Sequence, residues 1–487
     1  MKNSVRELAP TSLWNHFADL NAVPRPSKKE QKVIAFIENF GNKLGLETIT
    51  DEVGNVIIRK PATKGMENRV PISMQSHLDM VHQKNGDTIF DFETQGIEMF
   101  VDEDWVKAKG TTLGADNGIG VASIMTILSS KDIPHPPIEA LFTIDEETGM
   151  TGAMGLKGGI LHSKIMLNLD TEEDTELTIG CAGGLDVTAN GKYEQVAPGE
   201  HLKAYKITLK GLTGGHSGMD IHKGRANANK LMIRILFDGT ENYGWMIHSI
   251  EGGSLRNAIP RESVAIVALP QDKENESASL IQKINIILQK ENQTTDPNLS
   301  LSWEPVTIPD KVATKEFAAK IVRSVYTCQN GIYRMSPDIP GLVQTSNNLA
   351  RIQLKNGEYS IQCLTRSSVE TEKNDLAISL RNCFELMGSE VEFKGSYPGW
   401  TPNPNSPIVS LMSSLYQKRF GEKALVNACH AGLECGILGK NYPDMQMISF
   451  GPNIHGAHSP DEKVQISSVQ KYWGLLLETL EKIPVNS

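Results

Sequence analysis

Four apolar segments of this chain each run into side chains that can bind metal ions. Each reads as a buried β-strand, because short apolar runs bounded by turn signals are typical of such strands. In chain order, the segments are V-P-I-S-M-Q, E-A-L-F-T-I, K-I-M-L-N-L and M-I-S-F, and they are followed by His77 and Asp79, by Glu146 and Glu147, by Asp170, and by His455 and His458. In open α/β sheets, ligands bind outside the carboxyl ends of the strands. We therefore expect these side chains to converge on one site.

Strand and helix patterns alternate through the first part of the chain. We expect a helical region over residues 12–44, which Pro24 and Pro26 interrupt with a loop, and a strand pair over residues 48–59. The other elements expected here are strands at 70–75, 138–144 and 164–169 and a helix at 117–129. This alternation favours a mostly parallel sheet that is covered on both faces.

The middle of the chain has a different pattern, which indicates a second domain. Strands at 203–209 and 264–269 surround long helical patterns at 227–236 and 277–290. The α/β pattern returns after a Pro/Gly-rich stretch at 397–407. The elements expected there are a helix from Ile408, a strand at 445–450 and a helix from Ser467.

The fold class predicted from this order of elements is α/β. We expect a catalytic domain with a doubly wound mixed sheet, formed by residues 1–185 and 395–487 together. Residues 186–394 are expected to form an inserted α+β domain, which would serve as a lid and in dimerisation.

Composition excludes several classes of protein. The chain has 487 residues, 39% of them hydrophobic and 22% charged, as in ordinary globular domains. A net charge of -10 without a basic stripe argues against nucleic acid as a partner. No apolar run approaches the roughly 18 residues that span a membrane, and the polar N-terminus does not resemble a signal peptide. We expect a cytoplasmic protein whose six cysteines are reduced.

Each of these possible ligands is a weak signal alone. A histidine at a strand end is usually a hydrogen-bonded structural residue. Asp116, in G-T-T-L-G-A-D-N-G-I-G, resembles a helix N-cap, and no G-x-x-x-x-G-K-[ST] follows to indicate a phosphate loop. Their joint occurrence at several strand ends favours a metal site. Imidazoles together with carboxylates suit zinc, manganese or cobalt.

These motifs carry a family resemblance that spans nearly the whole chain. In order, they are S-H-L-D, G-A-D-N-G-I-G, D-E-E-T-G, N-L-D, G-G-H-S-G and H-S-P-D-E. The chain resembles the co-catalytic metallopeptidases that include carboxypeptidase G, the aminoacylases and the carnosinases. The segments K-P-A-T-K-G-M-E-N-R, L-R-N-A-I-P-R-E and H-A-G-L-E-C-G narrow the resemblance to the aminoacyl-histidine dipeptidases of this family. The resemblance implies hydrolysis of dipeptides with a free N-terminus, of the type Xaa-His and including β-alanyl-histidine.

The resemblance also implies a role for each residue of the metal site. Two divalent ions, zinc or alternatively manganese or cobalt, would be bridged by one shared aspartate. The residues implied are Asp116 as the bridge, His77 and Asp170 for one ion, Glu147 and His458 for the other, Asp79 as the carboxylate behind His77, and Glu146 as the general acid and base. Independently, neighbouring side chains at a strand end project differently, so Glu146 and Glu147 can hardly share one role. Asp145 is left as a solvated acid or a loop hydrogen-bond acceptor.

Four further residues are candidates for contacts with the substrate. His216 resembles the family's donor to the oxyanion, Asn257 a substrate-contacting amide, and Arg366 the residue that holds the substrate C-terminus. Glu434 lies among small and apolar residues and is our candidate for binding the free amino group. The alternatives are a solvated turn for His216, a surface ion pair for Arg366 and a buried structural ion pair for Glu434. His430 could line the leaving-residue pocket or belong to the core.

Several rival functions stay open at this point. An N-acyl amino-acid deacylase or a broader di- or tripeptidase would use the same metal residues. A thiol hydrolase using Cys429 and His430 is disfavoured, because adjacent residues seldom form a working pair. A catalytically silent small-ligand-binding protein would not need Glu146. We predict a homodimer, with the alternative that a doubled lid supplies the second half within one chain.

Overall fold

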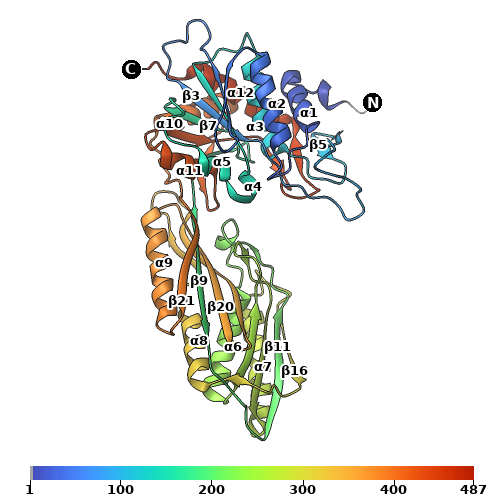
Figure 1. The fold of residues 1–487 in the computed structure, drawn as a ribbon, viewed down its shortest axis with the longest axis vertical. Coiled ribbons are helices and arrows are strands. Elements are labelled where there is room, and N and C mark those ends of the chain that lie inside the picture. Colours follow the sequence, from blue (N-terminus) through green and yellow to red (C-terminus); the bar gives the residue numbers. More distant parts are fainter. Residues whose placement is uncertain (1–3, 487) are drawn as a thin grey trace. The chain divides into compact units, whose positions relative to one another are not determined.

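The structure is a computed structural model that describes residues 4–486. These residues form two compact units (Figure 1). Unit 1 contains the chain up to Gly180, Trp400–Ala428 and the chain from Leu433. Unit 2 contains Cys181–Gly399 and the short segment Cys429–Gly432. The predicted boundaries, 1–185, 186–394 and 395–487, did not separate this last segment from its neighbours.

Unit 1 is built on a mixed sheet with the strand order β1-β2-β6-β3-β7-β23-β8-β22. The central strands β6, β3, β7 and β23 run parallel, whereas β1, β2 and β8 pair antiparallel to their neighbours. The strands are β1 (Glu47–Thr50), β2 (Val56–Lys60), β3 (Ile72–His77), β6 (Ile138–Thr143), β7 (Ile165–Asn168), β8 (Glu176–Cys181), β22 (Leu425–Cys429) and β23 (Gln446–Ser449). The predicted α/β fold with a mixed sheet is confirmed.

The strand order reverses at β3, and this reversal positions the site. The chain passes from β3 to β6 on one side of it and then returns to β7 on the other. Parallel crossovers are right-handed, so opposite directions of travel place the connections on opposite faces and leave a crevice at the carboxyl ends of the strands. His77 is the last residue of β3, and the chain leaves β6 and β7 at the same edge.

Helices α1, α2, α3, α10 and α12 surround this sheet. Helix α1 packs on α3, which packs on β3, while α10 contacts both α12 and β23. The predicted helical region 12–44 is divided into α1 and α2 by the loop that contains Pro24 and Pro26, as expected. The bounds are α1 (Thr11–Asn21), α2 (Gln31–Lys43), α3 (Ala115–Ser129), α4 (Glu146–Gly149), α5 (Thr151–Gly155), α10 (Pro407–Phe420), α11 (Glu434–Asn441) and α12 (Ile466–Lys482).

A small sheet beside the main one carries the loop of His458. Its strand order is β24-β25-β5-β4, and His458 lies in the connection between β24 and β25. The strands are β4 (Met99–Asp102), β5 (Trp105–Ala108), β24 (Ile454–His455) and β25 (Lys463–Gln465). Among residues 4–486, no helix combines the length and the apolar character needed to cross a membrane.

Unit 2 contains both helices and a large sheet (Figure 1). The strand order of this sheet is β16-β11-β15-β13-β19-β20-β9-β21. Apolar side chains from its strands and from α6, α7, α8 and α9 form one core. The strands are β9 (Gly183–Lys192), β11 (Leu202–Lys210), β13 (Met246–Gly252), β15 (Ser263–Pro270), β16 (Ser300–Val306), β18 (Gly331–Met335), β19 (Val343–Lys355), β20 (Glu358–Ser367) and β21 (Glu390–Tyr397). The helices are α6 (Ala228–Asn242), α7 (Glu274–Glu291), α8 (Lys315–Thr327) and α9 (Glu370–Glu385).

The core elements of unit 2 form two halves with the same β-α-β-β-α-β order. The first half runs β11-α6-β13-β15-α7-β16, and the second runs β9-α8-β19-β20-α9-β21. In both halves, the first strand lies between the third and the fourth, and the second strand lies beside the third. The halves join through their second strands, because β13 pairs antiparallel with β19. The first half is inserted between β9 and α8 of the second.

Candidate metal centre

His77 is held by the carboxylate of Asp79. Its side chain is 1% exposed, and its Nδ1 lies 3.4 Å from Asp79 Oδ1 and 3.1 Å from the Asp79 carbonyl oxygen. Asp79 is fully buried and also accepts the backbone N–H groups of Glu146 at 3.0 Å and Glu147 at 3.3 Å. An Nδ1–H group facing Asp79 leaves the lone pair of Nε2 for a ligand. Asp79 therefore fixes both His77 and the turn that carries the two glutamates.

Asp116 places its two carboxylate oxygens against two histidines. Oδ1 lies 3.1 Å from His77 Nε2, and Oδ2 lies 3.3 Å from His458 Nε2. The backbone of Asp116 and Asn117 is not helical, although both residues lie near the start of α3. Among residues 4–486, no backbone N–H of α3 donates to the Asp116 side chain, whose two oxygens face His77 and His458, so Asp116 does not act as a helix N-cap.

Two sets of possible ligand atoms within residues 4–486 share Asp116. In each set the atoms lie within 4.8 Å of one another. One set contains His77, Asp116 and Asp170, and the other contains Asp116, Glu147 and His458. The structure thus brings together, from four strand ends and the start of α3, the five ligands that the resemblance implies.

The residues present fit two divalent cations. Glu147 Oε2 lies 2.9 Å from His458 Nε2, but Glu147 Oε1 is buried and has no hydrogen-bond partner in the described part of the chain. Buried carboxylate oxygens are normally paired, and a cation would satisfy this one. Two imidazole nitrogens with several carboxylates form a donor set typical of zinc and of similar divalent metals.

The electrostatics of the ligands reflect their close approach. Burial raises the pKa of Asp116, but hydrogen bonds with His458 and His77 outweigh it and lower this pKa well below its ordinary value. Hydrogen bonds to Asp116 and then to Glu147 raise the pKa of His458 to about 11. Burial, followed by the negative charge of Asp116, raises the pKa of Glu147. The carboxylates here favour positive charge at the histidines, as they would favour cations.

Glu146 begins α4 directly before Glu147, which belongs to one of the two candidate ligand sets. One carboxylate oxygen of Glu146 lies within 4.8 Å of ligand atoms of both His77 and Glu147. Burial is the main cause that raises the pKa of Glu146 well above its ordinary value, and the charge of His77 opposes this rise. A half-buried carboxyl group with a raised pKa has the chemistry of a proton-transfer group.

Asp145 is a loop acceptor rather than a solvated acid. It is 4% exposed, and it accepts hydrogen bonds from the hydroxyl groups of Thr148 and, at 2.8 Å, Thr151. Its φ angle is +52°, a conformation that is uncommon outside glycine. Of the alternatives left open for Asp145, the loop hydrogen bond is confirmed.

His455 does not join the other strand-end residues, so this expectation is wrong. Its Nε2 lies 3.7 Å from Glu173, and its ring packs against Trp105 with the ring centroids 5.0 Å apart. None of the possible ligand sets among residues 4–486 includes His455. The turn after β24 directs His458 toward the ligands instead.

His216 and Asn257 lie on neighbouring segments of unit 2. The short strand β12 (Gly215–His216) pairs with β14 (Ala258–Ile259), and the N–H of Ser217 donates to the carbonyl of Asn257 at 2.7 Å. His216 Nδ1 accepts the backbone N–H groups of Gly218 at 3.2 Å and Met219 at 3.0 Å. The neutral imidazole must then carry its proton on Nε2, which makes Nε2 a hydrogen-bond donor.

Arg366 and His430 are buried in unit 2. Arg366 is 4% exposed, and its Nη1 donates to Tyr397 Oη at 2.8 Å. His430 Nε2 lies 2.7 Å from Ser346 Oγ. Within residues 4–486, no partner is found for Arg366 Nε or His430 Nδ1, and Arg366 forms no ion pair. The surface ion-pair alternative for Arg366 is therefore wrong.

Burial is the main cause that lowers the pKa of His430, to about 3, and the charge of Arg366 adds to it. The ordinary value is 6.5, so between these values the unfolded chain binds a proton that the folded protein does not. The stabilisation from neutral His430 is complete above pH 6.5 and is lost as the pH falls toward 3. We expect the free energy of unfolding to fall more steeply below pH 6.5 in the wild type than in His430→Gln, by at most about 1.4 kcal/mol per pH unit. Thermal unfolding at pH 4.5 to 7.5 measures this, and equal slopes would contradict it.

Glu434 is the first residue of α11 and is fully buried. Its Oε2 accepts hydrogen bonds from Gln75 Nε2 and Thr143 Oγ1, each at 2.6 Å. In the described part of the chain, Oε1 has no partner, and Glu434 takes part in no ion pair with a lysine or arginine. Burial raises the pKa of Glu434 to about 8. The structural ion-pair alternative for Glu434 is wrong.

Three residues around the ligands were not singled out in the sequence. Asn117 donates a hydrogen bond to Asp170, while Arg25 and Glu462 bind the backbone beside Asp116. Glu462 ends the motif H-S-P-D-E, and its place in that motif was an available signal. Arg25 stands between two prolines and carries no comparable signal.

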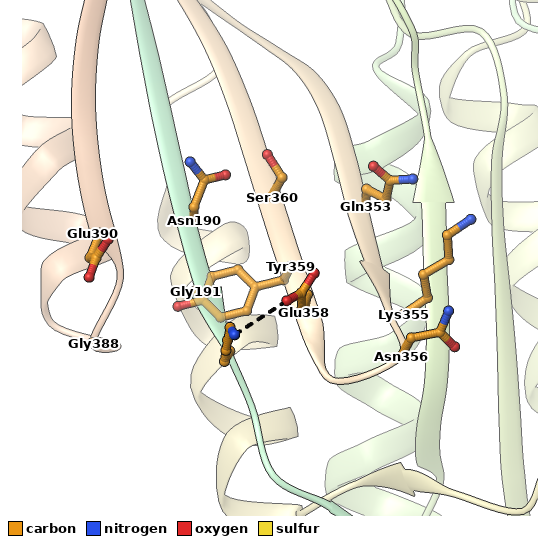
Figure 2. A pocket seen from close by; sticks show the side chains of 11 residues that line it. Asn190, Gly191, Gln353, Lys355, Asn356, Glu358, Tyr359, Ser360, Gly388 and Glu390 are labelled. Carbon is orange, nitrogen blue, oxygen red and sulfur yellow. Dashed lines mark ion pairs between the residues drawn. The ribbon is translucent and has the colours of Figure 1, made fainter.

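The pocket drawn in Figure 2 lies on the sheet of unit 2 and has a volume of about 720 Å³. Gln353, Ser360 and Asn190 lie in one row across three strands of this sheet. Lys192 and Glu358 form an ion pair of 3.6 Å at the pocket. Its lining includes none of the predicted site residues, and we assign it no part in the candidate centre.

Comparisons with known proteins show the family of this chain. Residues 74–482 match the model of peptidase family M20/M25/M40. The chain is 42% identical to the cytosol non-specific dipeptidase of Escherichia coli (strain K12) over 482 residues, or 99% of each chain. The crystal structure of aminoacylhistidine dipeptidase from Vibrio alginolyticus superposes with a TM-score of 0.93, at 41% identity over 100% of this chain and 99% of that one. Aminopeptidase PepT from Bacillus cereus, 17% identical over 98% of this chain and 99% of that one, has a TM-score of 0.57 and shares the fold. The chain therefore belongs to peptidase family M20/M25/M40 and is a hydrolase that acts on peptide bonds.

Proposed function

We propose that this protein hydrolyses the peptide bond of dipeptides with a free N-terminus, with Xaa-His dipeptides, including β-alanyl-histidine, as substrates. The observation that carries the proposal is the pair of ligand sets that share Asp116, with Glu146 beside them. The names of the similar proteins from Escherichia coli and Vibrio alginolyticus, both dipeptidases, support the substrate class.

Two divalent cations, zinc or alternatively manganese or cobalt, would be held by His77, Asp116, Asp170, Glu147 and His458. Such ions lower the pKa of water and polarise a carbonyl group. Glu146 takes the proton of the attacking water and returns it to the leaving amine. The raised pKa of Glu146 suits this role, because a general base works best when its own pKa lies near the ambient pH. Asp79 keeps Nε2 of His77 available as a ligand.

Three residues of unit 2 are proposed to bind the substrate. His216 donates from Nε2 to the developing oxyanion, and its hydrogen bonds with Gly218 and Met219 support this protonation state. Arg366 binds the C-terminal carboxylate, and its buried guanidinium group, whose Nε has no partner among residues 4–486, supports the assignment. Asn257 contacts the substrate from the segment paired with His216.

Glu434 is proposed to bind the free amino group of the substrate. A buried carboxylate whose Oε1 has no partner within residues 4–486 is poorly satisfied in the protein alone. An ammonium group would supply the missing hydrogen bond together with an opposite charge. This assignment distinguishes a dipeptidase from an N-acyl amino-acid deacylase, whose substrates carry no such charge.

A dipeptide panel tests the substrate class. We expect metal-replete enzyme to cleave Xaa-His and β-alanyl-His faster than Xaa-Leu, and to cleave N-acetyl-His poorly. Glu434→Gln should lower kcat/KM for free dipeptides by roughly 10–100-fold, because a hydrogen bond between charged groups contributes a free energy of about that size. The same substitution should change the cleavage of N-acylated substrates little. Equal losses on both classes would contradict the role of Glu434. Preferred cleavage of N-acetyl-His would favour the deacylase, and preferred cleavage of Xaa-Leu the broader di- or tripeptidase.

Two non-metal alternatives are disfavoured by specific residues. Burial raises the pKa of Cys429 to about 12, so this thiol is a poor source of the thiolate that a thiol hydrolase needs. A catalytically silent small-ligand-binding protein has no use for a proton-transfer group, yet Glu146 lies beside the ligands. Inactivation by a chelator but not by a thiol-alkylating reagent would separate the first alternative from the proposal.

We also infer a cytoplasmic protein that has neither nucleic acid nor membrane as a partner. The net charge of -10 and the word cytosol in the name of the Escherichia coli relative support this. A homodimer remains our prediction from the sequence, although the pairing of β13 with β19 already joins two similar halves within one chain. Light scattering decides between a monomer of 53.5 kDa and a dimer of twice this mass.

A further inference from the structure

We propose that Arg25 and Glu462 are positioning residues that clamp the backbone of residues 113–116, and thereby set the place of the Asp116 carboxylate for both ligand sets. Neither residue is a ligand in this proposal. The inference rests on the proposed metal centre, because it concerns the geometry of a residue that both sets share.

The buried carboxylate of Glu462 accepts hydrogen bonds from successive backbone N–H groups. Glu462 is 2% exposed. Oε2 accepts from Leu113 at 2.7 Å and Gly114 at 2.9 Å, and Oε1 accepts from Ala115 at 2.7 Å and Asp116 at 3.2 Å. These N–H groups lie at or just before the start of α3, where a helix leaves its donors unsatisfied and favours negative charge. The carboxylate thus fixes every N–H group from Leu113 to Asp116.

Arg25 binds the same loop through its carbonyl groups. It is 1% exposed, and its Nη2 donates to the carbonyl of Gly114 at 2.5 Å. Its Nη1 donates to the carbonyls of Leu78 at 3.1 Å and Asp79 at 3.2 Å, which directly follow His77. Arg25 therefore ties the loop that carries Asp116 to the segment that carries His77.

Gly114 shows how closely this clamp fits. Its φ angle is +71°, a conformation that favours glycine. A Cβ atom at this position would lie 2.5 Å from Arg25 Nη2 and 2.8 Å from Met80 Sδ. Arg25 and Glu462 therefore bind the C=O and the N–H of one residue, and Arg25 occupies the space that a side chain on Gly114 would need.

The clamp matters for metal binding because Asp116 belongs to both sets. A shift of its backbone moves Oδ1 away from His77 or Oδ2 away from His458, whose nitrogens now lie 3.1 Å and 3.3 Å away. Residues that orient ligands typically contribute about 10–100-fold to metal affinity. Loss of the clamp should therefore weaken both ions together.

The test is the zinc affinity of the folded full-length chain, measured by competition with a chromogenic chelator. Glu462→Gln keeps the size of the side chain but replaces one acceptor oxygen with an NH₂ group that faces backbone N–H groups. We expect zinc affinity to fall about 10–100-fold, and hydrogen exchange at the amides of residues 113–116 to become faster. Arg25→Lys keeps the charge but cannot reach carbonyls on both segments, and should act in the same direction.

Glu139→Gln is the matched control. Glu139 is 6% exposed and accepts the backbone N–H groups of His162 at 2.8 Å and Ser163 at 2.9 Å, near the start of β6 rather than at its carboxyl end. We expect this variant to lose thermal stability while its zinc affinity stays at the wild-type value. Wild-type zinc affinity in Glu462→Gln and Arg25→Lys would overturn the proposal, and if one variant does not fold, the other decides. Failure of the wild type itself to bind zinc, manganese or cobalt would instead overturn the metal centre.

Discussion

Glu146→Gln is expected to remove dipeptide hydrolysis and to leave folding and metal content unchanged. The substitution keeps the shape of the side chain but removes the atom that accepts a proton. A positioned proton-transfer group typically contributes about 10²–10⁴-fold to the rate. Glu146 is a member of neither ligand set that shares Asp116, so its loss should not release metal.

The measurement is kcat on a Xaa-His dipeptide, at metal contents matched by elemental analysis. Glu173→Gln provides the control, because Glu173 is an exposed glutamate outside both ligand sets, with its Oε1 3.7 Å from His455 Nε2. We expect this control to have wild-type activity. Substantial hydrolysis by Glu146→Gln at full metal occupancy would show that another group moves the proton.

Asp116→Asn is expected to lose both metal ions, whereas His458→Ala should lose one. Asparagine is neutral and has a single side-chain acceptor, so it cannot bridge two cations as a carboxylate does. His458 belongs to one of the two sets and Asp116 to both. Substitution of a residue that only supports a ligand typically lowers metal affinity by about 10–100-fold. The loss of metal affinity in Asp116→Asn should be larger.

Elemental analysis after dialysis distinguishes these outcomes through the number of ions per chain. The expected order is wild type, His458→Ala and then Asp116→Asn, with activity following the same order. Retention of one ion by Asp116→Asn, together with retention of both by His458→Ala, would contradict a shared aspartate. Circular dichroism on each variant separates loss of metal from loss of fold.

The sequence predicted the convergence of ligands well because the rule behind it depends only on topology. Apolar strands that alternate with helices pair in parallel, and parallel strands bring their carboxyl ends to one edge. His77 and Asp170 therefore meet, with nitrogen and oxygen 3.4 Å apart, although 93 positions separate them. His455 shows the limit of the rule, since one turn after β24 decides which of two nearby histidines faces the site.

The surroundings of Glu434 could not be predicted in the same way. Its hydrogen bonds come from Gln75 and Thr143, which are 359 and 291 positions away. Neither residue belongs to a motif with a chemical meaning of its own, and hydrophobic periodicity describes only which face of an element is buried. Asp145 is similar, because its φ angle of +52° depends on the loop hydrogen bonds around it.

The repeat within unit 2 could not be recognised from the sequence, because one half is inserted into the other. The first strand of the second half, β9, is separated from the rest of that half by the whole of the first half. A search for one period along the sequence therefore finds none. The repeat becomes visible only when strand order and connection order are compared.

Because both halves of unit 2 lie in one chain, their sequences can differ from each other. When identical subunits pair, every substitution appears on both sides of the axis, so a residue that suits one side must be tolerated on the other. In unit 2, each half can change alone. The candidate substrate residues differ between the halves, since His216 and Asn257 come from the first half and Arg366 comes from the second. One half can thus specialise for the reacting carbonyl and the other for the substrate C-terminus, a division of labour that strict symmetry forbids.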